Sequence, residues 1–176
     1  MIHPTAIVDR KAEIDSSVEI GPYCIIEGNV IIKKESKLLS HIVVQGRTEI
    51  GENCTISPFA ALGGPPQDIS YKKEDTGLCV GNNNIIKEYV TMNRGTIHGK
   101  GITRVGDNNF IMAYSHIAHD CIVGNNIIMA NCATLAGHVE VSDSVIFAGL
   151  CAVHQFCKIG KHAFISGLTG VPKDVP

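Results

Sequence analysis

The sequence predicts an all-β solenoid, a β-helix built from hexapeptide repeats, and three observations support this fold class. Every sixth residue is hydrophobic in three runs, which begin at Ile2, Val80 and Val105 and contain eleven, three and twelve hexads. The residue four places after each of these anchors is mostly small or β-branched, and glycine often follows the anchor directly, as at Gly21 and Gly51. A period of six fits neither the 3.6 residues of a helix turn nor the alternation of a strand. It is typical of short strands joined by tight corners.

The repeat resembles that of the hexapeptide acyltransferase superfamily. The solenoid of that superfamily is a left-handed parallel β-helix, a three-sided prism with about eighteen residues in each coil. The resemblance therefore implies three parallel sheets whose strands recur every third hexad. Each coil would pair with the coils on either side of it, so that only the end coils have open edges.

Two loop excursions are expected at one corner of this prism. With three hexads in a coil, the hexads that begin at Leu62 and Met92 fall on the same face. The register is interrupted after both, near 64–77 and 94–102, and resumes on the next face each time. We therefore expect one β-helix domain over 1–176 with both loops at one edge. Loops that leave a rigid repeat at one edge usually line a binding surface.

Composition and charge exclude several classes of function. A chain of 176 residues with a net charge of −2 is long enough for one core and has no clustered basic surface for nucleic acid. Neither a charged leader with an apolar run nor an apolar stretch of about 20 residues is present, so we expect a cytoplasmic protein without a transmembrane segment.

The cysteines fit the repeat. Five of the seven fall on the second inward position of a hexad: Cys24, Cys54, Cys121, Cys151 and Cys157. They are expected to be reduced core thiols, and no C-x-x-C spacing indicates a metal site.

Three histidines share the face that carries the excursions. Ile117, Leu135 and Val153 begin hexads on that face, and His119, His138 and His154 follow them. Adjacent strands are about 5 Å apart, so the three imidazoles are expected to form a ladder beside one corner. Imidazole exchanges protons near neutral pH, which makes this column the candidate catalytic site.

The motif His116-Ile117-Ala118-His119-Asp120-Cys121 resembles that of the bacterial UDP-N-acetylglucosamine O-acyltransferases, which begin lipid A synthesis. Further matching motifs run through the chain in the family's order: Pro66-Gln67-Asp68, Asn93-Arg94-Gly95-Thr96, Leu135-Ala136-Gly137-His138-Val139, Ala152-Val153-His154-Gln155-Phe156-Cys157 and Asp174-Val175-Pro176. The family transfers a 3-hydroxyacyl group from acyl carrier protein to the glucosamine 3-hydroxyl of UDP-N-acetylglucosamine. The resemblance implies the same substrates, a homotrimer with sites between subunits, and no cofactor.

The resemblance also implies catalytic roles. His119 is the expected general base, since an alcohol is a poor nucleophile until a base takes its proton. The backbone N–H of Gly137 is the expected donor to the developing oxyanion. Asp120 is expected to orient or charge-stabilise His119, provided that the corner geometry lets adjacent side chains meet.

Other positions match residues that bind substrate in the family. They are Asp68 for the sugar, His138 and Gln155 for the acceptor and acyl pocket, and Gly167 for acyl length. A glycine at this last position favours a longer acyl chain. Gln67, His116 and His154 are further expected substrate-binding residues. Ser70 departs from the family, which usually has Lys there. The family's C-terminal helices, with their basic residues for substrate phosphates, are also missing, so weaker substrate binding by this chain is expected.

Two other functions fit parts of the pattern. A γ-type carbonic anhydrase has the same fold and binds zinc through three histidines, but its ligand spacing differs from His116-x-x-His119. A β-helix that binds a partner without catalysis would also show the repeat. Metal analysis and binding of UDP-N-acetylglucosamine distinguish these alternatives.

Overall fold

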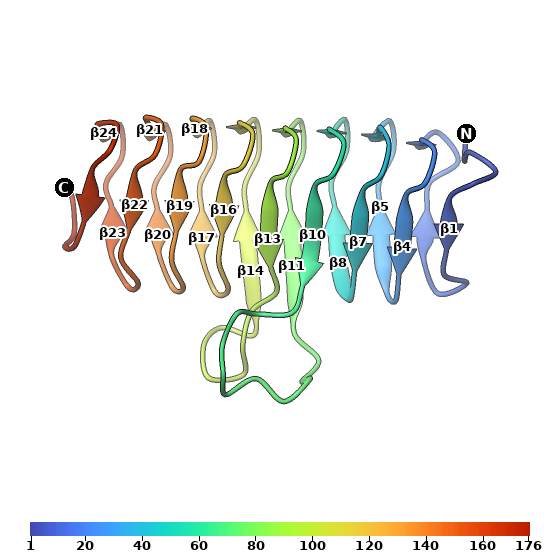
Figure 1. The fold of residues 1–176 in the computed structure, drawn as a ribbon, viewed down its shortest axis with the longest axis horizontal. Coiled ribbons are helices and arrows are strands. Elements are labelled where there is room, and N and C mark those ends of the chain that lie inside the picture. The colour runs from blue at the N-terminus through green and yellow to red at the C-terminus, as the bar shows by residue number, and fades with distance from the viewer.

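The protein is a straight rod of stacked coils, with its two termini at opposite ends (Figure 1). A computed structural model describes residues 1–176, which form 25 strands and no α-helix. Each strand pairs in parallel with the third strand before it and the third strand after it in the sequence, except that the strands at the ends of each sheet have one partner. The chain contains no helix that is long and apolar enough to cross a lipid bilayer.

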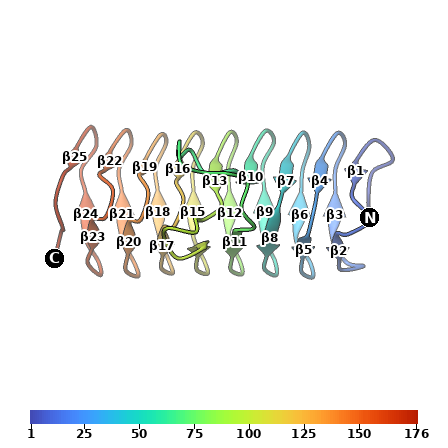
Figure 2. The ribbon, with the colours of Figure 1, turned by 90° about the horizontal axis from the view of Figure 1, so that it is seen from below.

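The strands form three parallel sheets, one on each side of the prism (Figure 2). The nine strands of the first sheet are β1 (Ile7–Val8), β4 (Ile25–Glu27), β7 (Val43–Gln45), β10 (Ala61–Gly64), β13 (Thr91–Asn93), β16 (His116–Ile117), β19 (Thr134–Leu135), β22 (Ala152–Val153) and β25 (Gly170–Val171). The eight of the second are β2 (Glu13–Ile14), β5 (Val30–Ile32), β8 (Arg47–Ile50), β11 (Gly77–Val80), β14 (Ile102–Val105), β17 (Ile122–Val123), β20 (Glu140–Val141) and β23 (Lys158–Ile159). The eight of the third are β3 (Glu19–Ile20), β6 (Lys37–Leu38), β9 (Thr55–Ile56), β12 (Ile85–Ile86), β15 (Phe110–Ile111), β18 (Ile128–Met129), β21 (Ile146–Phe147) and β24 (Phe164–Ile165).

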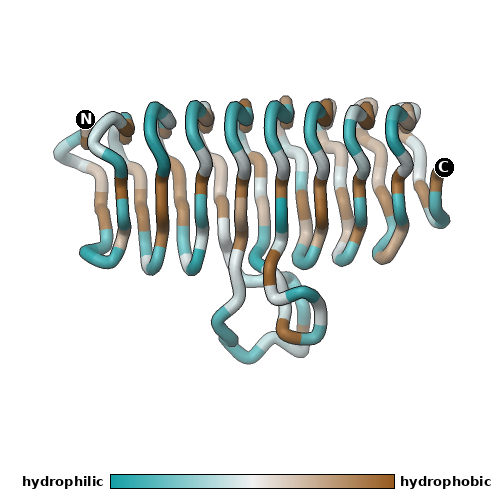
Figure 3. Tube along the Cα trace, turned by 180° about the vertical axis from the view of Figure 1, so that it is seen from behind, coloured by the Kyte–Doolittle hydropathy of each residue, from teal (hydrophilic) through white to brown (hydrophobic).

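The hexad anchors form the core. Every anchor from Ile20 to Val171 is buried, and hydrophobic residues recur at the same place in successive coils (Figure 3). The first three anchors are the exception, since Ile2 is 47% exposed while Val8 and Ile14 are partly buried. These three lie in the coil that has a neighbour on one side only. The sixfold pattern therefore predicts the core correctly wherever a coil is covered on both sides.

The corners differ from the sequence expectation in one respect. Apart from Gly63, the glycines that follow the anchors do not adopt a left-handed backbone. That conformation falls on the fourth residue of the hexad, which is usually not glycine. Gly106 shows why glycine is needed after the anchor, because a Cβ there would lie 2.7 Å from the carbonyl oxygen of Gly124 in the next coil. These glycines allow coils to approach closely instead of supplying a permissive φ.

A ladder of buried asparagines joins the coils at one corner. Asn84 and Asn109 occupy second inward positions, where the repeat otherwise places small hydrophobic residues. The Asn109 side chain donates to the carbonyl of Gly124 at 3.1 Å and accepts from the N–H of Ile127 at 2.7 Å. Its own N–H donates to Oδ1 of Asn84 at 2.9 Å. The ladder therefore satisfies buried main-chain groups that the short strands leave unpaired.

Asn109→Leu is expected to destabilise the fold strongly. The substitution removes the partners of Gly124 O and Ile127 N–H, and each buried group left unpaired costs about 1–3 kcal/mol. Urea unfolding followed by circular dichroism measures the loss. The exposed Asn131, changed to Leu in the same way, should shift the free energy of unfolding by only about 0.5 kcal/mol. Equal effects of the two substitutions would refute the role of the ladder.

Both excursions project from the same edge of the prism (Figure 1). The first joins β10 to β11 and the second joins β13 to β14. Pairing in the first sheet shows their sizes. A coil without an excursion separates paired residues by eighteen positions, as between Val43 and Ala61. The separation rises to thirty between Ala61 and Thr91, across the first excursion, and to twenty-five between Thr91 and His116, across the second. The two loops lie in adjacent coils, next to the strands that carry the histidines.

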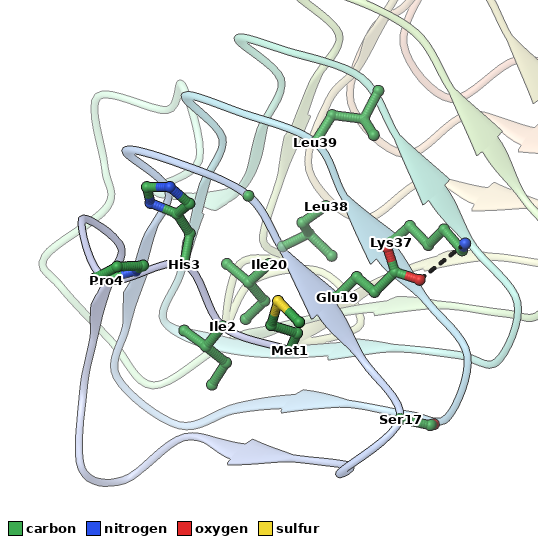
Figure 4. Close-up of a pocket in the computed structure, with 11 residues that line it drawn as sticks. Met1, Ile2, His3, Pro4, Ser17, Glu19, Ile20, Lys37, Leu38 and Leu39 are labelled. Carbon is green, nitrogen blue, oxygen red and sulfur yellow. Dashed lines mark ion pairs between the residues drawn. The ribbon is translucent and has the colours of Figure 1, made fainter.

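A cavity of about 680 Å³ lies at the N-terminal end of the rod, between Ile2 and Leu39 (Figure 4). Lys37 and Glu19 form an ion pair of 2.9 Å at its rim. None of the residues expected to act in catalysis lines this cavity.

Candidate active site

His119 and Asp120 form a hydrogen-bonded pair at the corner that follows β16. Nδ1 of His119 lies 3.0 Å from Oδ2 of Asp120. Adjacent residues meet here because Asp120 is the left-handed corner residue, with φ of 60°, which turns its side chain toward the same side as His119. The expected pairing of these two side chains is present in the structure. The pair leaves Nε2 of His119 as the nitrogen available to a substrate.

The Asp120 carboxylate is fully buried and its oxygens accept several hydrogen bonds. Thr96 donates through its N–H and its hydroxyl, and the N–H of Lys100 donates at 2.9 Å. Burial of the carboxyl raises its pKa, but the hydrogen bonds from Thr96, His119 and Lys100 outweigh burial and hold the pKa of Asp120 below its usual value. Asp120 is therefore ionised at neutral pH beside the imidazole.

Asp120→Asn is expected to change how stability depends on pH. A carboxylate whose pKa is lower in the folded state adds stability above its unfolded pKa of about 3.9, and this contribution disappears as the pH falls through the folded pKa. The advantage of the wild-type protein over Asp120→Asn should therefore be complete above about pH 5 and shrink below about pH 4. Urea unfolding at several pH values measures it. A constant difference between the two proteins down to acid pH would contradict the pKa assignment.

Gly137 lies against the imidazole of His119, one coil further on. A Cβ at this position would lie 2.6 Å from Cε1 and 2.7 Å from Nε2 of His119. Only glycine therefore leaves enough room for the imidazole in its observed position. The N–H of Gly137 donates to no other group of the chain. The imidazole of His119, whose Nε2 has no partner in the chain, therefore packs directly against the buried Gly137, whose N–H has none either.

The expected ladder of three imidazoles is wrong at its third member. His138 contacts His119 edge to face, with 5.1 Å between ring centroids, and stacks on Phe156 at 4.5 Å. His138 and Phe156 are both fourth residues of their hexads, whereas His154 is a second residue and lies exposed beside a shallow cavity with Pro172. Hexad position, and not proximity in the sequence, decides which side chains stack. Burial lowers the pKa of His138, and the nearby Asp120 opposes this effect.

His116 and Asp68 border the same region. Nδ1 of His116 lies 2.7 Å from the hydroxyl of Thr91, and burial next to His119 lowers the pKa of His116. Asp68 is in the first excursion, where the N–H and hydroxyl of Ser70 both donate to its Oδ1 at 2.8 Å and lower its pKa. Ser70 therefore fixes the Asp68 carboxylate within the loop, whereas the longer side chain of a lysine would extend outward.

The remaining expected residues are not all near His119. Gln67 and Gln155 are exposed, and the side chain of neither forms a hydrogen bond within the chain. Gly167 lies at the corner that follows β24, next to Gly149, and so at a different corner from His119. A single chain does not bring Gly167 to the site.

A zinc centre of three histidines does not fit this geometry. Only two imidazoles converge, and ligand atoms of His119, Asp120 and His138 lie within 4.8 Å of one another. The Asp120 oxygens already accept hydrogen bonds from the second excursion. The donor set is that of an acid–base pair, and this disfavours the carbonic anhydrase alternative. Cys121 is no reactive group either, because burial raises the pKa of its thiol to about 12.

Comparisons with known proteins show which family the chain resembles. The family model for the bacterial transferase hexapeptide (six repeats) matches residues 102–137. An acyl-[acyl-carrier-protein]–UDP-N-acetylglucosamine O-acyltransferase from Thermodesulfovibrio yellowstonii is 59% identical over 99% of this chain and 68% of its own length. The corresponding protein of a Janthinobacterium species is 53% identical over the whole chain and 67% of its own length. The UDP-N-acetylglucosamine acyltransferase structure from Francisella novicida superimposes with a TM-score of 0.98, at 45% identity, over 100% of this chain and 64% of that one.

Fold and site together define a hexapeptide-repeat acyltransferase, and the match to solved structures confirms the left-handed winding of the prism. The chain belongs to the acyl-[acyl-carrier-protein]–UDP-N-acetylglucosamine O-acyltransferase family. The family that the sequence motifs indicated is confirmed. The chain spans about two thirds of the length of the relatives that it matches.

Proposed function

We propose that this chain carries the centre for transfer of a 3-hydroxyacyl group from acyl carrier protein to the 3-hydroxyl of UDP-N-acetylglucosamine, the first step of lipid A synthesis. The observation that carries the proposal is the His119–Asp120 pair, whose imidazole packs against Gly137, while neither Nε2 of His119 nor the N–H of Gly137 has another partner in the chain. A base and an oxyanion donor at one point are what acyl transfer to an alcohol requires.

In the proposed reaction, Nε2 of His119 takes the proton of the sugar hydroxyl as the oxygen attacks the thioester carbonyl. The charge on the carbonyl oxygen is stabilised by the N–H of Gly137. Collapse of the tetrahedral intermediate breaks the carbon–sulfur bond, and the imidazolium returns the proton to the departing thiolate. Asp120 stabilises the imidazolium while it exists and fixes Nδ1 as the protonated nitrogen of the neutral ring.

The flanking residues suit substrate recognition. Asp68 is a partly exposed carboxylate, close enough for the charge of His119 to act on it, and carboxylates bind sugar hydroxyls through short hydrogen bonds. His138 and Phe156 offer a flat stacked surface beside the base. We assign Gln67, Gln155, His116 and His154 to the rim of the substrate site.

A homotrimer with sites between subunits is part of the proposal. Gly167 and His119 lie at different corners of the prism, so they can border one acyl pocket only if a second copy supplies one of them. Light scattering on the purified protein should give three times the chain mass. We place the enzyme in the cytoplasm, where a carrier protein and a nucleotide sugar are both available.

The test is an assay of the whole protein with 3-hydroxyacyl carrier protein and UDP-N-acetylglucosamine, followed by mass spectrometry of the sugar product. We expect an O-acylated nucleotide sugar, and no product with the 3-deoxy analogue. Thermal stabilisation by UDP-N-acetylglucosamine without any turnover would favour the non-catalytic binding module. One equivalent of zinc per chain, with loss of metal in the His119→Ala variant, would instead support the carbonic anhydrase alternative.

A further inference from the structure

The second excursion closes over the one carboxylate of the catalytic pair. The N–H of Thr96 donates to both oxygens of Asp120, at 3.1 and 3.0 Å, and its hydroxyl donates to Oδ2 at 2.7 Å. The N–H of Lys100 adds a bond to Oδ1. With Nδ1 of His119, the two oxygens are engaged by four donor groups, so the carboxylate is held against rotation about its Cβ–Cγ bond.

The loop is shaped for this contact. Gly99 lies so close to the carboxylate that a Cβ there would collide with Cγ and both oxygens of Asp120. The turn is held by Thr96, whose carbonyl accepts from the N–H groups of Gly99 and Gly101, at 3.2 and 2.9 Å. The Thr96 hydroxyl also accepts from Gly99 N–H at 3.1 Å, so its single proton is free for Asp120.

Contacts on both sides fix the loop to the prism. Nζ of Lys100 pairs with Glu140 in β20, with 2.7 Å between the atoms. The hydroxyl of Thr103, in β14 directly after the loop, accepts from the N–H of Asp120 at 2.8 Å. The loop is therefore joined to β20, and Asp120 is joined to β14, on the two sides of β17.

We infer that Thr96 is a positioning residue for the acyl transfer, which holds Asp120 in the orientation that keeps the proton of neutral His119 on Nδ1 and leaves Nε2 as the base. The inference rests on the proposed function, since it gives the second excursion a role in the same reaction. An imidazole in the other tautomer would present an N–H to the sugar hydroxyl and could not accept its proton. The Thr96 hydroxyl donates the shortest hydrogen bond to Oδ2 of Asp120, the oxygen that receives Nδ1–H. Without the hydroxyl, the loop holds this oxygen only through the longer bond from the Thr96 N–H, at 3.0 Å, so the carboxylate gains freedom to rotate.

The experiment compares Thr96→Ala with Thr96→Ser, which keeps the hydroxyl, and with Thr55→Ala. Thr55 is partly buried in β9 and its hydroxyl forms no hydrogen bond in the chain, so it is a matched control away from the site. The first readout is the ¹⁵N spectrum of the His119 imidazole in this chain at about pH 8, where imidazole is neutral. The second is kcat and KM in the whole protein.

We expect one tautomer, protonated at Nδ1, in the wild type, Thr96→Ser and Thr55→Ala, and a mixture in Thr96→Ala. Thr96→Ala should lose about 10- to 100-fold in kcat, with KM within about threefold, because a misplaced catalytic group costs rate more than affinity. A lower melting temperature with an unchanged tautomer and kcat would overturn the inference and leave Thr96 as a loop anchor. Absence of turnover in the wild type would refute the proposed function instead, and the tautomer readout would still decide the role of Thr96.

Discussion

His119→Ala in the whole protein should lose transfer rate by roughly 10²–10⁴-fold, which is the usual contribution of a positioned general base. Binding of UDP-N-acetylglucosamine should survive, since the base acts mainly in the transition state. Folding should survive as well, because the side chain lies at a corner and belongs to no part of the hydrophobic core. Steady-state kinetics, sugar binding and thermal unfolding of the same variant test all three statements.

The matched control is His162→Ala, an exposed histidine at another corner of the prism. It should keep its activity. Unchanged turnover in His119→Ala would remove His119 as the base and direct attention to His138, its edge-to-face neighbour. A loss of stability that parallels the loss of rate would instead make His119 a structural residue.

Gly137→Ala is the second substitution with a large expected effect. The added methyl group would lie within 2.7 Å of Nε2 of His119, so the imidazole must move. Displacing a catalytic group by about 1 Å can cost 10²-fold in rate, so we expect a loss of that order in kcat. The melting temperature should change little, because the displaced atoms belong to a side chain at the surface edge and not to the backbone of a coil.

Gly64→Ala supplies the control, because Gly64 has the same hexad position on the same sheet. A Cβ there meets its nearest neighbours, Asn93 and Gln45, at ordinary contact distances of 3.7 and 3.8 Å. This variant should keep wild-type kcat. A Gly137→Ala protein with full activity would show that the imidazole has room to shift without leaving its working position.

The repeat predicts most of the fold because one rule acts in every coil. A hydrophobic residue every sixth position specifies which side chains face the axis, and this holds from Ile20 to Val171. The rule says nothing about Asn84 and Asn109, which are polar yet buried because they bond to main-chain groups of neighbouring coils. It also does not explain Gly106, where the short distance to the next coil leaves no room for a Cβ atom.

The site is predicted as far as it follows from the register. Register places His119, Gly137 and His138 together, and the structure shows their contacts. His138 and Phe156 share a hexad position in successive coils and stack, whereas His154 has another position and does not extend the column. Thr96 and Lys100 could not be placed, because they lie in an excursion where the repeat is interrupted and only coordinates show the path of the chain.

The coil-by-coil pairing has a consequence for how the chain reaches this structure. Most contacting strands are separated by eighteen residues, about a tenth of the chain, which is a value common among helical bundles and low for all-β proteins. Loop closure is therefore a small entropic cost at each step, and a coil once formed offers an edge on which the next can add. The longest closures are those across the two excursions, so assembly should be slowest where the active site is built.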